Sequence, residues 1–325
     1  MKILVSGAAG MIGRKLVERL ARDGALGGEQ ITRLDACDVI APTPSPAPFP
    51  IHAEANDIAA AYVAPKLVVG RPDVIFWLAS IVSGEAEADL EKGYAINLDG
   101  TRFLIEAIRR EHALSAGQWK PRVVFTSSIA VFGAPFPDAI PDDFHTTPLT
   151  SYGTQKAICE LLLSDYSRRG FLDAVSLRLP TICVRPGAPN KAASGFFSNI
   201  IREPLRGLPA VLPVDDDVRH HHASPRAAVG FLLHAATMDT APLGGRRAIT
   251  MPGVSVTVAE QIEALRRFAG DKAVALIKRE PDETIRRIVG GWSRQFETPR
   301  AEALGFHAEQ DFDEIIRAHI EDEHG

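Results

Sequence analysis

Three glycines near the N-terminus constrain the fold of this chain more than any other feature of its sequence. The run Gly7-Ala-Ala-Gly10-Met-Ile-Gly13 follows a short apolar segment, Ile3 to Val5, and opens Met11 to Arg22, where apolar residues recur at helical spacing. This order predicts a strand, a tight turn and a helix. Glycines at such a turn let the backbone approach a pyrophosphate, whose charge then lies at the helix N-terminus. A plain strand-to-helix turn is the alternative for the glycines alone. The residues expected to contact a dinucleotide here are Gly7, Gly10, Met11 and Ile12.

An acidic residue in the next predicted strand indicates which dinucleotide fits. Ile31 to Leu34 is predicted as a strand that closes at Asp35, 22 residues after Gly13. A carboxylate there accepts hydrogen bonds from ribose hydroxyls and repels a 2′-phosphate, which favours NAD over NADP. Asp57, followed by Ile58, is a second cofactor candidate that could meet the adenine amine. A turn or helix-capping role is the equal alternative for Asp57.

Short apolar strands alternate with helices along the first 180 residues. The alternation predicts an α/β fold of Rossmann type, in which a doubly wound parallel sheet is covered by helices on both faces. Residues 1–180 are expected to form the NAD-binding domain, and 219–250 to return to it. Residues 181–218 and 251–325 are expected to form a smaller, mixed substrate-binding part. The further elements predicted are strands at Val74–Leu78, Val123–Thr126 and Val175–Leu179, and helices at Asp89–Arg110, Ser151–Arg169, Ala227–Thr237, Val258–Phe268 and Phe312–Glu321.

Two stretches are predicted to lack regular structure. Five prolines alternate with other residues between Pro42 and Pro50, and proline cannot donate to a strand ladder, so this is an extended surface loop. The stretch 184–218 is rich in glycine, proline, asparagine and serine, and its apolar pieces are broken by Pro204 and Pro213. We therefore expect it to be irregular.

A tyrosine and a lysine are four residues apart at the start of a predicted helix. Tyr152 and Lys156 then share one helix face, so the ammonium group can lie near the phenol. A nearby cation favours the phenolate and lowers the tyrosine pKa from about 10 toward the working range. The spacing alone is common and usually marks an ordinary amphipathic pair. Its context is Ser127-Ser128, at the end of the strand Val123 to Thr126, where the carboxyl ends of a parallel sheet open to ligands.

Together these motifs resemble the extended short-chain dehydrogenase/reductase family over roughly residues 1–250. The resemblance implies that Ser128, Tyr152 and Lys156 are catalytic, with Ser127 the less favoured of the two serines. It implies a histidine where this chain has Trp77. The further cofactor residues that it implies are Leu78 and Ala79 at a strand end, Asn97 in an N-x-x-G-T motif, and Pro180 and Ile182 beside the nicotinamide amide.

Several reactions occur in this family. Its dehydratases carry an Asp-Glu pair after the catalytic serine or threonine, and Ile129 and Ala130 stand at those positions here. Further segments, among them 79–87 and 179–187, are similar to a subgroup of dehydrogenases that oxidise the C2 hydroxyl of a four-carbon sugar acid to the 2-oxo acid. A sugar-nucleotide epimerase with tightly bound NAD is the alternative, and an NAD-binding regulator is a third possibility that the Ser-Tyr-Lys set argues against.

A small sugar acid needs a cation and several polar groups around it. Arg219 is the first candidate for the carboxylate, followed by Asn190 and Lys191, and for each a surface or structural role is equally open. The three adjacent histidines 220–222 point in different directions in an extended chain, so no metal site is expected. One of them could line the substrate pocket, and packing is the alternative. The full set of substrate candidates is Ser80, Ser83, Ser128, Arg185, Asn190, Lys191, Ser194 and Arg219.

The charge balance gives no reason to expect a nucleic acid or an anionic membrane as partner, because 36 basic and 41 acidic side chains leave a net charge of −5. No apolar run reaches the length needed to span a bilayer. Three scattered cysteines suit a reducing compartment, so a cytoplasmic protein is expected. In the family that the chain resembles, the helices that carry Asn97 and Tyr152 commonly pair between subunits, which implies a homodimer. The apolar residues around Ile158 to Leu163 suit a helix that is buried on more than one side.

Overall fold

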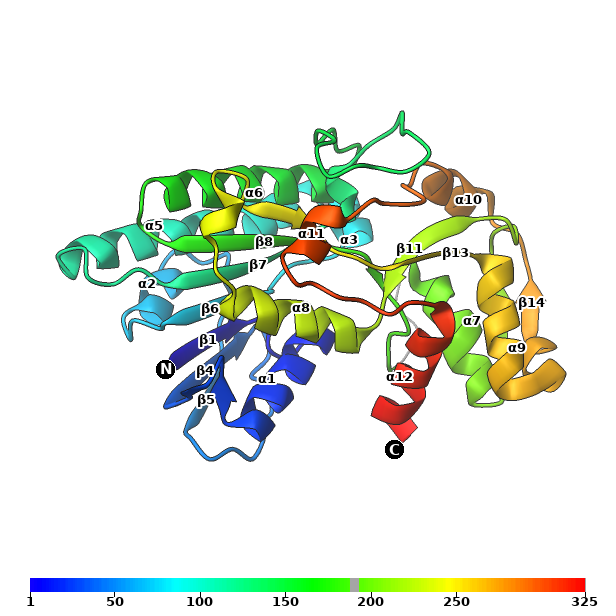
Figure 1. Ribbon diagram of the computed structural model, residues 1–325, viewed down its shortest axis with the longest axis horizontal. Coiled ribbons are helices and arrows are strands. Elements are labelled where there is room, and N and C mark those ends of the chain that lie inside the picture. Colours follow the sequence, from blue (N-terminus) through cyan, green and yellow to red (C-terminus); the bar gives the residue numbers. More distant parts are fainter. Residues whose placement is uncertain (188–192, 325) are drawn as a thin grey trace. The chain divides into compact units, whose positions relative to one another are not determined.

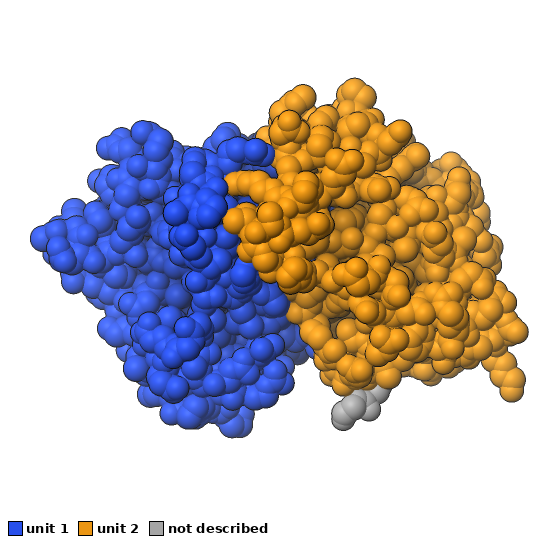
Figure 2. All heavy atoms as spheres, in the orientation of Figure 1, with its two compact units in different colours: residues 1–131, 150–178, 229–249 blue, residues 132–149, 179–228, 250–325 orange. Residues whose placement is uncertain are grey.

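The computed structural model describes residues 1–187 and 193–324, and it divides the chain into two compact units (Figure 2). The expected division placed 132–149 with the first part and let 219–250 return to it. In the structure 132–149 lies in the second unit, and the returning segment begins at Val229 because strand β11 (Arg219–Ala223) pairs with strands of the second unit. The first unit comprises Met1–Val131, Thr150–Arg178 and Val229–Ile249, and the second comprises Phe132–Leu149, Leu179–Ala228 and Thr250–Gly325.

A seven-stranded sheet forms the centre of the first unit (Figure 1). Its strands are ordered β12-β8-β7-β6-β1-β4-β5, and the ladders that join β5, β4, β1, β6 and β7 are parallel. This arrangement confirms the predicted α/β fold with a doubly wound, Rossmann-type sheet. The strands are β1 (Lys2–Ser6), β4 (Arg33–Asp38), β5 (Ile51–Ala55), β6 (Val74–Trp77), β7 (Arg122–Ser128), β8 (Asp173–Leu179) and β12 (Ala248–Thr250).

Helices cover both faces of this sheet (Figure 1). One face carries α2 (Val63–Val68), α5 (Gly100–Leu114) and α6 (Ser151–Arg168), which share one buried apolar cluster with the strands. The other face carries α1 (Met11–Asp23) and, from Val229 onward, α8 (Pro225–Thr237). Burial of apolar surface on both faces explains why the central strands are continuously apolar rather than alternating.

The helix predicted at Asp89–Arg110 is interrupted by a wider turn. After α3 (Ser83–Ala88), the short helix α4 (Leu90–Gly93) runs into a π-helical turn, η1 (Tyr94–Asp99), and then into α5. One extra residue in a helical turn re-aims the side chains inside it, and such turns often occur at functional sites.

Two predictions about the chain's local structure were wrong. The second strand was expected at Ile31–Leu34 with Asp35 at its end, but β4 runs from Arg33 to Asp38. The stretch 184–218 was expected to be irregular, but it contains the helix α7 (Gly195–Leu205). Pro204 lies in the last turn of α7, where it removes one backbone donor just before the helix ends at Leu205.

The second unit has its own apolar core, formed mainly by α7, α9 and α12. Beside them lie a three-stranded sheet of order β13-β11-β9 and a parallel pair, β10 with β14. No helix in the described part of the chain combines the length and apolar character needed to cross a bilayer. The remaining elements here are β9 (Thr181–Ile182), β10 (Ala210–Leu212), β13 (Val254–Thr257), β14 (Ile277–Arg279), α9 (Val258–Val274), α10 (Glu283–Gly290), α11 (Pro299–Ala303) and α12 (Phe312–His324).

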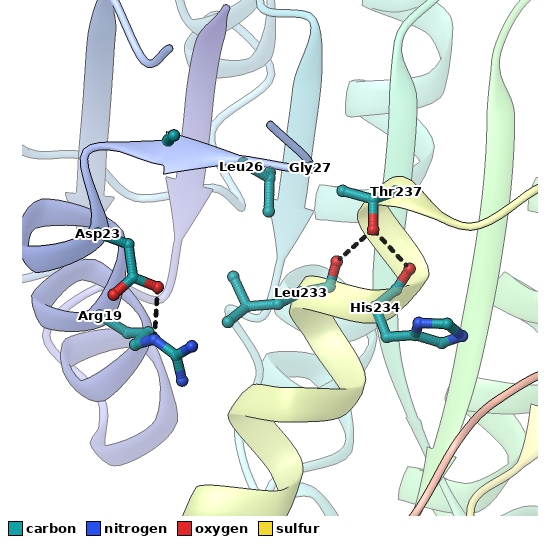
Figure 3. A pocket seen from close by; sticks show the side chains of 8 residues that line it. Arg19, Asp23, Leu26, Gly27, Leu233, His234 and Thr237 are labelled. Atoms are coloured by element: carbon teal, nitrogen blue, oxygen red, sulfur yellow. Dashed lines mark hydrogen bonds and ion pairs between the residues drawn. The ribbon is translucent and has the colours of Figure 1, made fainter. Parts of the chain in front are cut away.

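A shallow surface hollow of the first unit lies between α1, the hairpin of β2 (Ala25–Leu26) and β3 (Glu29–Gln30), and α8 (Figure 3). The Thr237 hydroxyl faces the backbone of α8 there and donates to the carbonyls of Leu233 and His234. A Cβ at Gly27 would lie 2.7 Å from Thr237 Cγ2, so the hairpin packs tightly on this helix. None of the candidate cofactor or catalytic residues lines this hollow, which is a packing feature of the fold.

Candidate active site

The glycine turn between β1 and α1 can be formed only by glycine at two of its positions. Gly7 has a φ of +75°, and a Cβ there would lie 2.6 Å from the backbone nitrogen of Ala79. A Cβ at Gly13 would lie 2.0 Å from the Gly7 carbonyl oxygen. These contacts bring the turn, the first turn of α1 and the end of β6 into direct backbone contact.

The N-terminus of α1 fits an anionic ligand. Its N-cap is Gly10, and no side chain accepts a hydrogen bond from the first turn of the helix. Gly10 is exposed, while Met11 and Ile12 are half-buried. Backbone N–H groups at a helix start that lacks a side-chain cap are the usual partners of a pyrophosphate. The four residues that were predicted from the glycine motif therefore lie together at this helix start.

Asp38, rather than Asp35, lies beside the glycine turn. Asp35 pairs in register with Leu4 of β1, and it lies on the same sheet face as Cys37. Leu4 and Cys37 both pack into the apolar cluster that the sheet shares with α2 and α5. Its carboxylate is held by a two-point ion pair with Arg33. Asp38 ends β4 and accepts a hydrogen bond from the backbone N–H of Ala9, at 3.0 Å. A ribose-binding carboxylate is expected at the carboxyl end of this strand, and Asp38 lies there, three residues beyond the Asp35 that was named from the sequence.

Asp57 and Ile58 follow β5 in a tight turn. The exposed carboxylate of Asp57 accepts a hydrogen bond from Ala59 N, at 2.9 Å, so the turn role weighed from the sequence is present. Ile58 is buried and packs against α5, where a Cβ at Gly100 would lie 3.0 Å from its Cδ1.

The loop after β6 is held in place by Ser6 and by the buried side-chain amide of Asn97. Leu78 and Ala79 receive support from Ser6, whose backbone carbonyl and hydroxyl accept their N–H groups at 3.2–3.5 Å. Asn97 lies in the π-helical turn, and its Oδ1 accepts from the Ser80 hydroxyl and from Ile81 N, both at 2.9 Å.

The Asn97 amide nitrogen also has partners, the Ile81 carbonyl at 3.2 Å and Gln155 Oε1 at 2.7 Å. The side-chain hydrogen bonds of Asn97, which was predicted to bind the cofactor, thus hold the loop after β6 in position. Trp77, which stands where the family has histidine, donates from its indole nitrogen to Thr101.

Tyr152 and Lys156 face each other at the start of α6. Lys156 Nζ lies 5.6 Å from the centre of the Tyr152 ring and 4.7 Å from that of Phe125. It donates to the carbonyl oxygen of Thr126, at 2.8 Å. The side chain is almost completely buried, and this desolvation lowers the pKa of Lys156 to about 8. Thr150 caps the helix by accepting from Gly153 N, which fixes its first turn.

The two serines at the end of β7 have different surroundings. Ser127 is buried and donates to the Glu160 carboxylate at 2.5 Å, so its hydroxyl is committed to the protein interior. Ser128 is half-buried, and its hydroxyl oxygen accepts a short-range hydrogen bond from Ala130 N, at 3.1 Å. Ser128 is therefore the serine that remains suited to contact a substrate.

The other substrate and nicotinamide candidates are distributed over the sequence. Ser83 begins α3 in the first unit. In the second unit, Pro180 is buried just before β9 and Ile182 is buried within it. Asn190 and Lys191 lie outside the described residues.

The two candidate arginines already bind groups of the second unit. Arg185 donates to the Ile182 carbonyl and to the hydroxyl of Ser194, at 3.1 and 3.3 Å. Arg219 donates to the Ser255 carbonyl, at 2.7 Å, and pairs with Glu260.

The three histidines of β11 are core residues. The rings of His220 and His222 pack edge to face, and Phe197 stacks on His220 with a centroid distance of 5.2 Å. Burial lowers the pKa of His220 to about 3 and that of His221 to about 4, and it lowers the pKa of His222 strongly. Within the described residues no group of three or more His, Cys, Asp or Glu side chains could hold a metal ion.

Comparisons with known proteins identify the family of this chain. The model of the NAD dependent epimerase/dehydratase family matches residues 3–238. A D-erythronate dehydrogenase of Cupriavidus necator is 44% identical over 99% of this chain and 98% of its own length. A D-erythronate dehydrogenase of Haemophilus influenzae is 38% identical over 99% of each chain.

Solved structures show the same fold. The crystal structure of a protein described as a nucleoside-diphosphate-sugar epimerase, from Agrobacterium tumefaciens, is 64% identical, with a TM-score of 0.97 over 100% of this chain and 95% of that one. An L-threonine dehydrogenase from Cupriavidus necator shares the fold at 22% identity, with a TM-score of 0.84 over 99% of each chain. NAD is the cofactor, and the two full-length relatives identify an NAD-dependent dehydrogenase. The chain belongs to the NAD dependent epimerase/dehydratase family, within the extended short-chain dehydrogenases.

Proposed function

We propose that this enzyme oxidises the C2 hydroxyl of a small sugar acid, D-erythronate or a close analogue, to the 2-oxo acid, with Tyr152 as the base. The observation that carries the proposal is the buried Lys156 ammonium beside the Tyr152 ring. The substrate class comes from the two D-erythronate dehydrogenases that align with the chain from end to end.

The residues around the glycine turn fit NAD. The helix start at Gly10 would bind its pyrophosphate, and Asp38 would accept hydrogen bonds from its adenosine ribose. When bound, NAD supplies the hydride acceptor for the reaction. The carboxylate of Asp38 would repel a 2′-phosphate, which supports NAD over NADP.

The chemistry of the chain's own residues is proton transfer from the substrate hydroxyl. Tyr152, as phenolate, accepts that proton as the carbon is oxidised. Lys156 stabilises the phenolate by its charge, and its bond to the Thr126 carbonyl fixes its position. Ser128 donates a hydrogen bond to the substrate oxygen and holds it in place as it becomes a carbonyl.

The carboxylate of the acid needs a cation, and Arg219 and Arg185 remain our candidates. Arg219 is about one-third exposed, and one of its nitrogens pairs with the half-exposed carboxylate of Glu260. A substrate carboxylate could replace such an exposed partner at little cost, because surface ion pairs contribute about 0–1 kcal/mol. Arg185 donates to the Ile182 carbonyl and to the Ser194 hydroxyl, and these two bonds fix the orientation of its guanidinium group.

A sugar-nucleotide epimerase is the second candidate, because the 64% identical crystal structure carries that description. The two functions differ in what happens to the hydride. An epimerase returns it to the same sugar and shows no net reduction of NAD, whereas a dehydrogenase releases NADH.

Mixing the protein with NAD and a panel of four- to six-carbon aldonates, and separately with UDP- or dTDP-sugars, tests the proposal. We expect NADH absorbance at 340 nm to rise with D-erythronate or a close analogue. Interconversion of a nucleotide sugar without NADH release, together with inert aldonates, would contradict it.

A further inference from the structure

A buried carboxylate lies one helical turn beyond the catalytic lysine. Glu160 is only 4% exposed, and its oxygens accept hydrogen bonds from the Arg178 guanidinium at 2.8–3.2 Å and from the Ser127 hydroxyl at 2.5 Å. Arg178 is itself largely buried. No step of the proposed reaction uses these three side chains, yet a buried ion pair is costly unless its geometry is good and its remaining hydrogen-bonding positions are filled.

The three side chains belong to three different elements of the sheet layer. Glu160 lies on α6, Ser127 on β7 and Arg178 on β8. The cluster therefore joins α6 to both neighbouring strands by charge-assisted hydrogen bonds, which are about twice as strong as neutral ones. β7 and α6 are the two elements that carry Ser128, Tyr152 and Lys156.

The cluster also adjoins Lys156 directly. Ser127 follows Thr126, whose carbonyl receives the Lys156 ammonium, and Glu160 shares the helix face of Lys156 at a spacing of four residues. Burial disfavours the charged form of Lys156, while the negative charge of Glu160 favours it. The titratable groups near Lys156 are Tyr152, Cys159 and Glu160 on α6, while β7 presents the Phe125 ring and the Thr126 carbonyl. Arg178 on β8 is the ion-pair partner of Glu160.

We propose that Glu160, held by Arg178 and Ser127, is a positioning residue for catalysis that locks α6 against β7 and keeps Lys156 in its ammonium form. The inference rests on the proposed role of Lys156 and Tyr152, but not on the identity of the substrate. Arg178 binds the Glu160 carboxylate and so keeps that carboxylate from turning toward Lys156 and pairing with its ammonium group. The Thr126 carbonyl then remains the partner that aims Lys156 toward Tyr152.

Two effects follow, and different variants separate them. Glu160→Gln removes the charge and keeps the shape, so the pKa of Lys156 should fall by ~1 unit, the lower end of what the loss of a nearby opposite charge does to a pKa. Ser127→Ala keeps all charges but removes one tie between α6 and β7. It should leave the pKa of Lys156 within about 0.3 units and lower kcat by roughly fivefold or more, because a small displacement of catalytic groups is costly.

The test is an NMR titration of the full-length protein labelled with ε-13C lysine. The Lys156 signal is assigned as the signal that disappears in the Lys156→Met variant. Its chemical shift is followed from pH 6 to pH 11 in the original protein, Glu160→Gln, Ser127→Ala and Arg178→Lys. Glu106→Gln is the matched control, since it removes another ion-paired carboxylate of the first unit, whose partners are Arg109 and Tyr166. Arg178→Lys keeps the opposite charge and should keep the Lys156 titration near that of the original.

A downward shift in folded Glu160→Gln that is absent from Glu106→Gln supports the proposal, and an unshifted Lys156 titration overturns it. If Glu160→Gln does not fold, Ser127→Ala decides: a loss of turnover smaller than about fivefold overturns the positioning role, and a loss of about fivefold or more supports it. The titration needs no substrate, so it still decides if no aldonate is oxidised, an outcome that would refute only the proposed function.

Discussion

Lys156 Nζ lies 5.6 Å from the centre of the Tyr152 ring, one turn further along α6. A cation at this distance in a buried setting favours the phenolate of Tyr152. The same burial lowers the pKa of Lys156 to about 8, so in the free protein the ammonium form predominates below that pH and is lost above it. The phenolate and its cation thus coexist only within a window of pH.

The first prediction is the pH dependence of turnover. In the original protein kcat/KM for the sugar acid should rise with pH as Tyr152 ionises, and it should fall above about pH 8 as Lys156 loses its proton. Lys156→Met removes the cation, so the rising limb should move ~1–2 units to higher pH and the falling limb should disappear. Initial rates of NADH formation across pH 6–10.5 measure both limbs. Identical profiles for the two proteins would show that Lys156 does not control the base.

A second prediction separates two aspartates of β4. Asp38→Ala should weaken NAD binding by about 1.5–3 kcal/mol, since charge-assisted hydrogen bonds to the ribose are lost, and should narrow the preference over NADP. Asp35→Ala is the matched control, because its carboxylate is already paired with Arg33 and lies on the opposite sheet face. Titration calorimetry with NAD and NADP distinguishes them. A larger loss of NAD affinity in Asp35→Ala would reverse the assignment.

The buried histidines predict sensitivity to acid. His220 and His221 have folded pKa values of about 3 and 4, below the ordinary value of 6.5, so the unfolded chain binds their protons first. Their contribution to stability is complete above pH 6.5 and is lost as pH falls toward 4. With His222 also neutral and buried, the free energy of unfolding should fall by up to about 4 kcal/mol per pH unit in this window.

Urea unfolding at pH 7.5, 6 and 5 measures that slope. His220→Gln should make it shallower, whereas His52→Gln, at an exposed position on β5, should leave it unchanged. A free energy of unfolding that is level from pH 7.5 to 5 would contradict the account of these residues.

A homodimer through α5 and α6 is the fourth prediction. Leu161 is 71% exposed on α6, and Ile158 and Leu162 beside it are only half-buried, so the first unit leaves an apolar strip uncovered on this helix. Leu161→Glu should convert the dimer to a monomer, whereas Asp165→Lys, a polar exchange at an exposed position one turn further on, should not. Light scattering at micromolar concentration reads the mass. A monomeric original protein would refute the prediction.

The sequence alone located the glycine turn and the Tyr152–Lys156 pair, because each depends on short-range spacing. It pointed to Asp35, whereas the structure favours Asp38, because the end of β4 is set by its pairing with β1 and β5 rather than by local preference. A strict two-residue alternation from Cys37 would have placed Asp38, not Asp35, on the face toward α1.

Long-range contacts were hidden for a related reason. Glu160 lies 33 residues after Ser127 and 18 residues before Arg178 in the sequence. Nothing in the local sequence patterns shows that these three side chains contact one another. Helix α7 was missed because glycine and proline at its two ends resemble loop composition, while Phe197 and Ile201 in its middle bury the face that stabilises it.

The central claim is that Tyr152 is the base of an NAD-dependent sugar acid dehydrogenase. Tyr152→Phe keeps the ring packed but removes the proton acceptor, so turnover with D-erythronate or the best aldonate should fall by at least ~10²–10⁴-fold. NAD affinity, measured in parallel by calorimetry, should stay nearly unchanged. A Tyr152→Phe protein that forms NADH within tenfold of the original rate, with NAD bound as before, would show that another group accepts the proton.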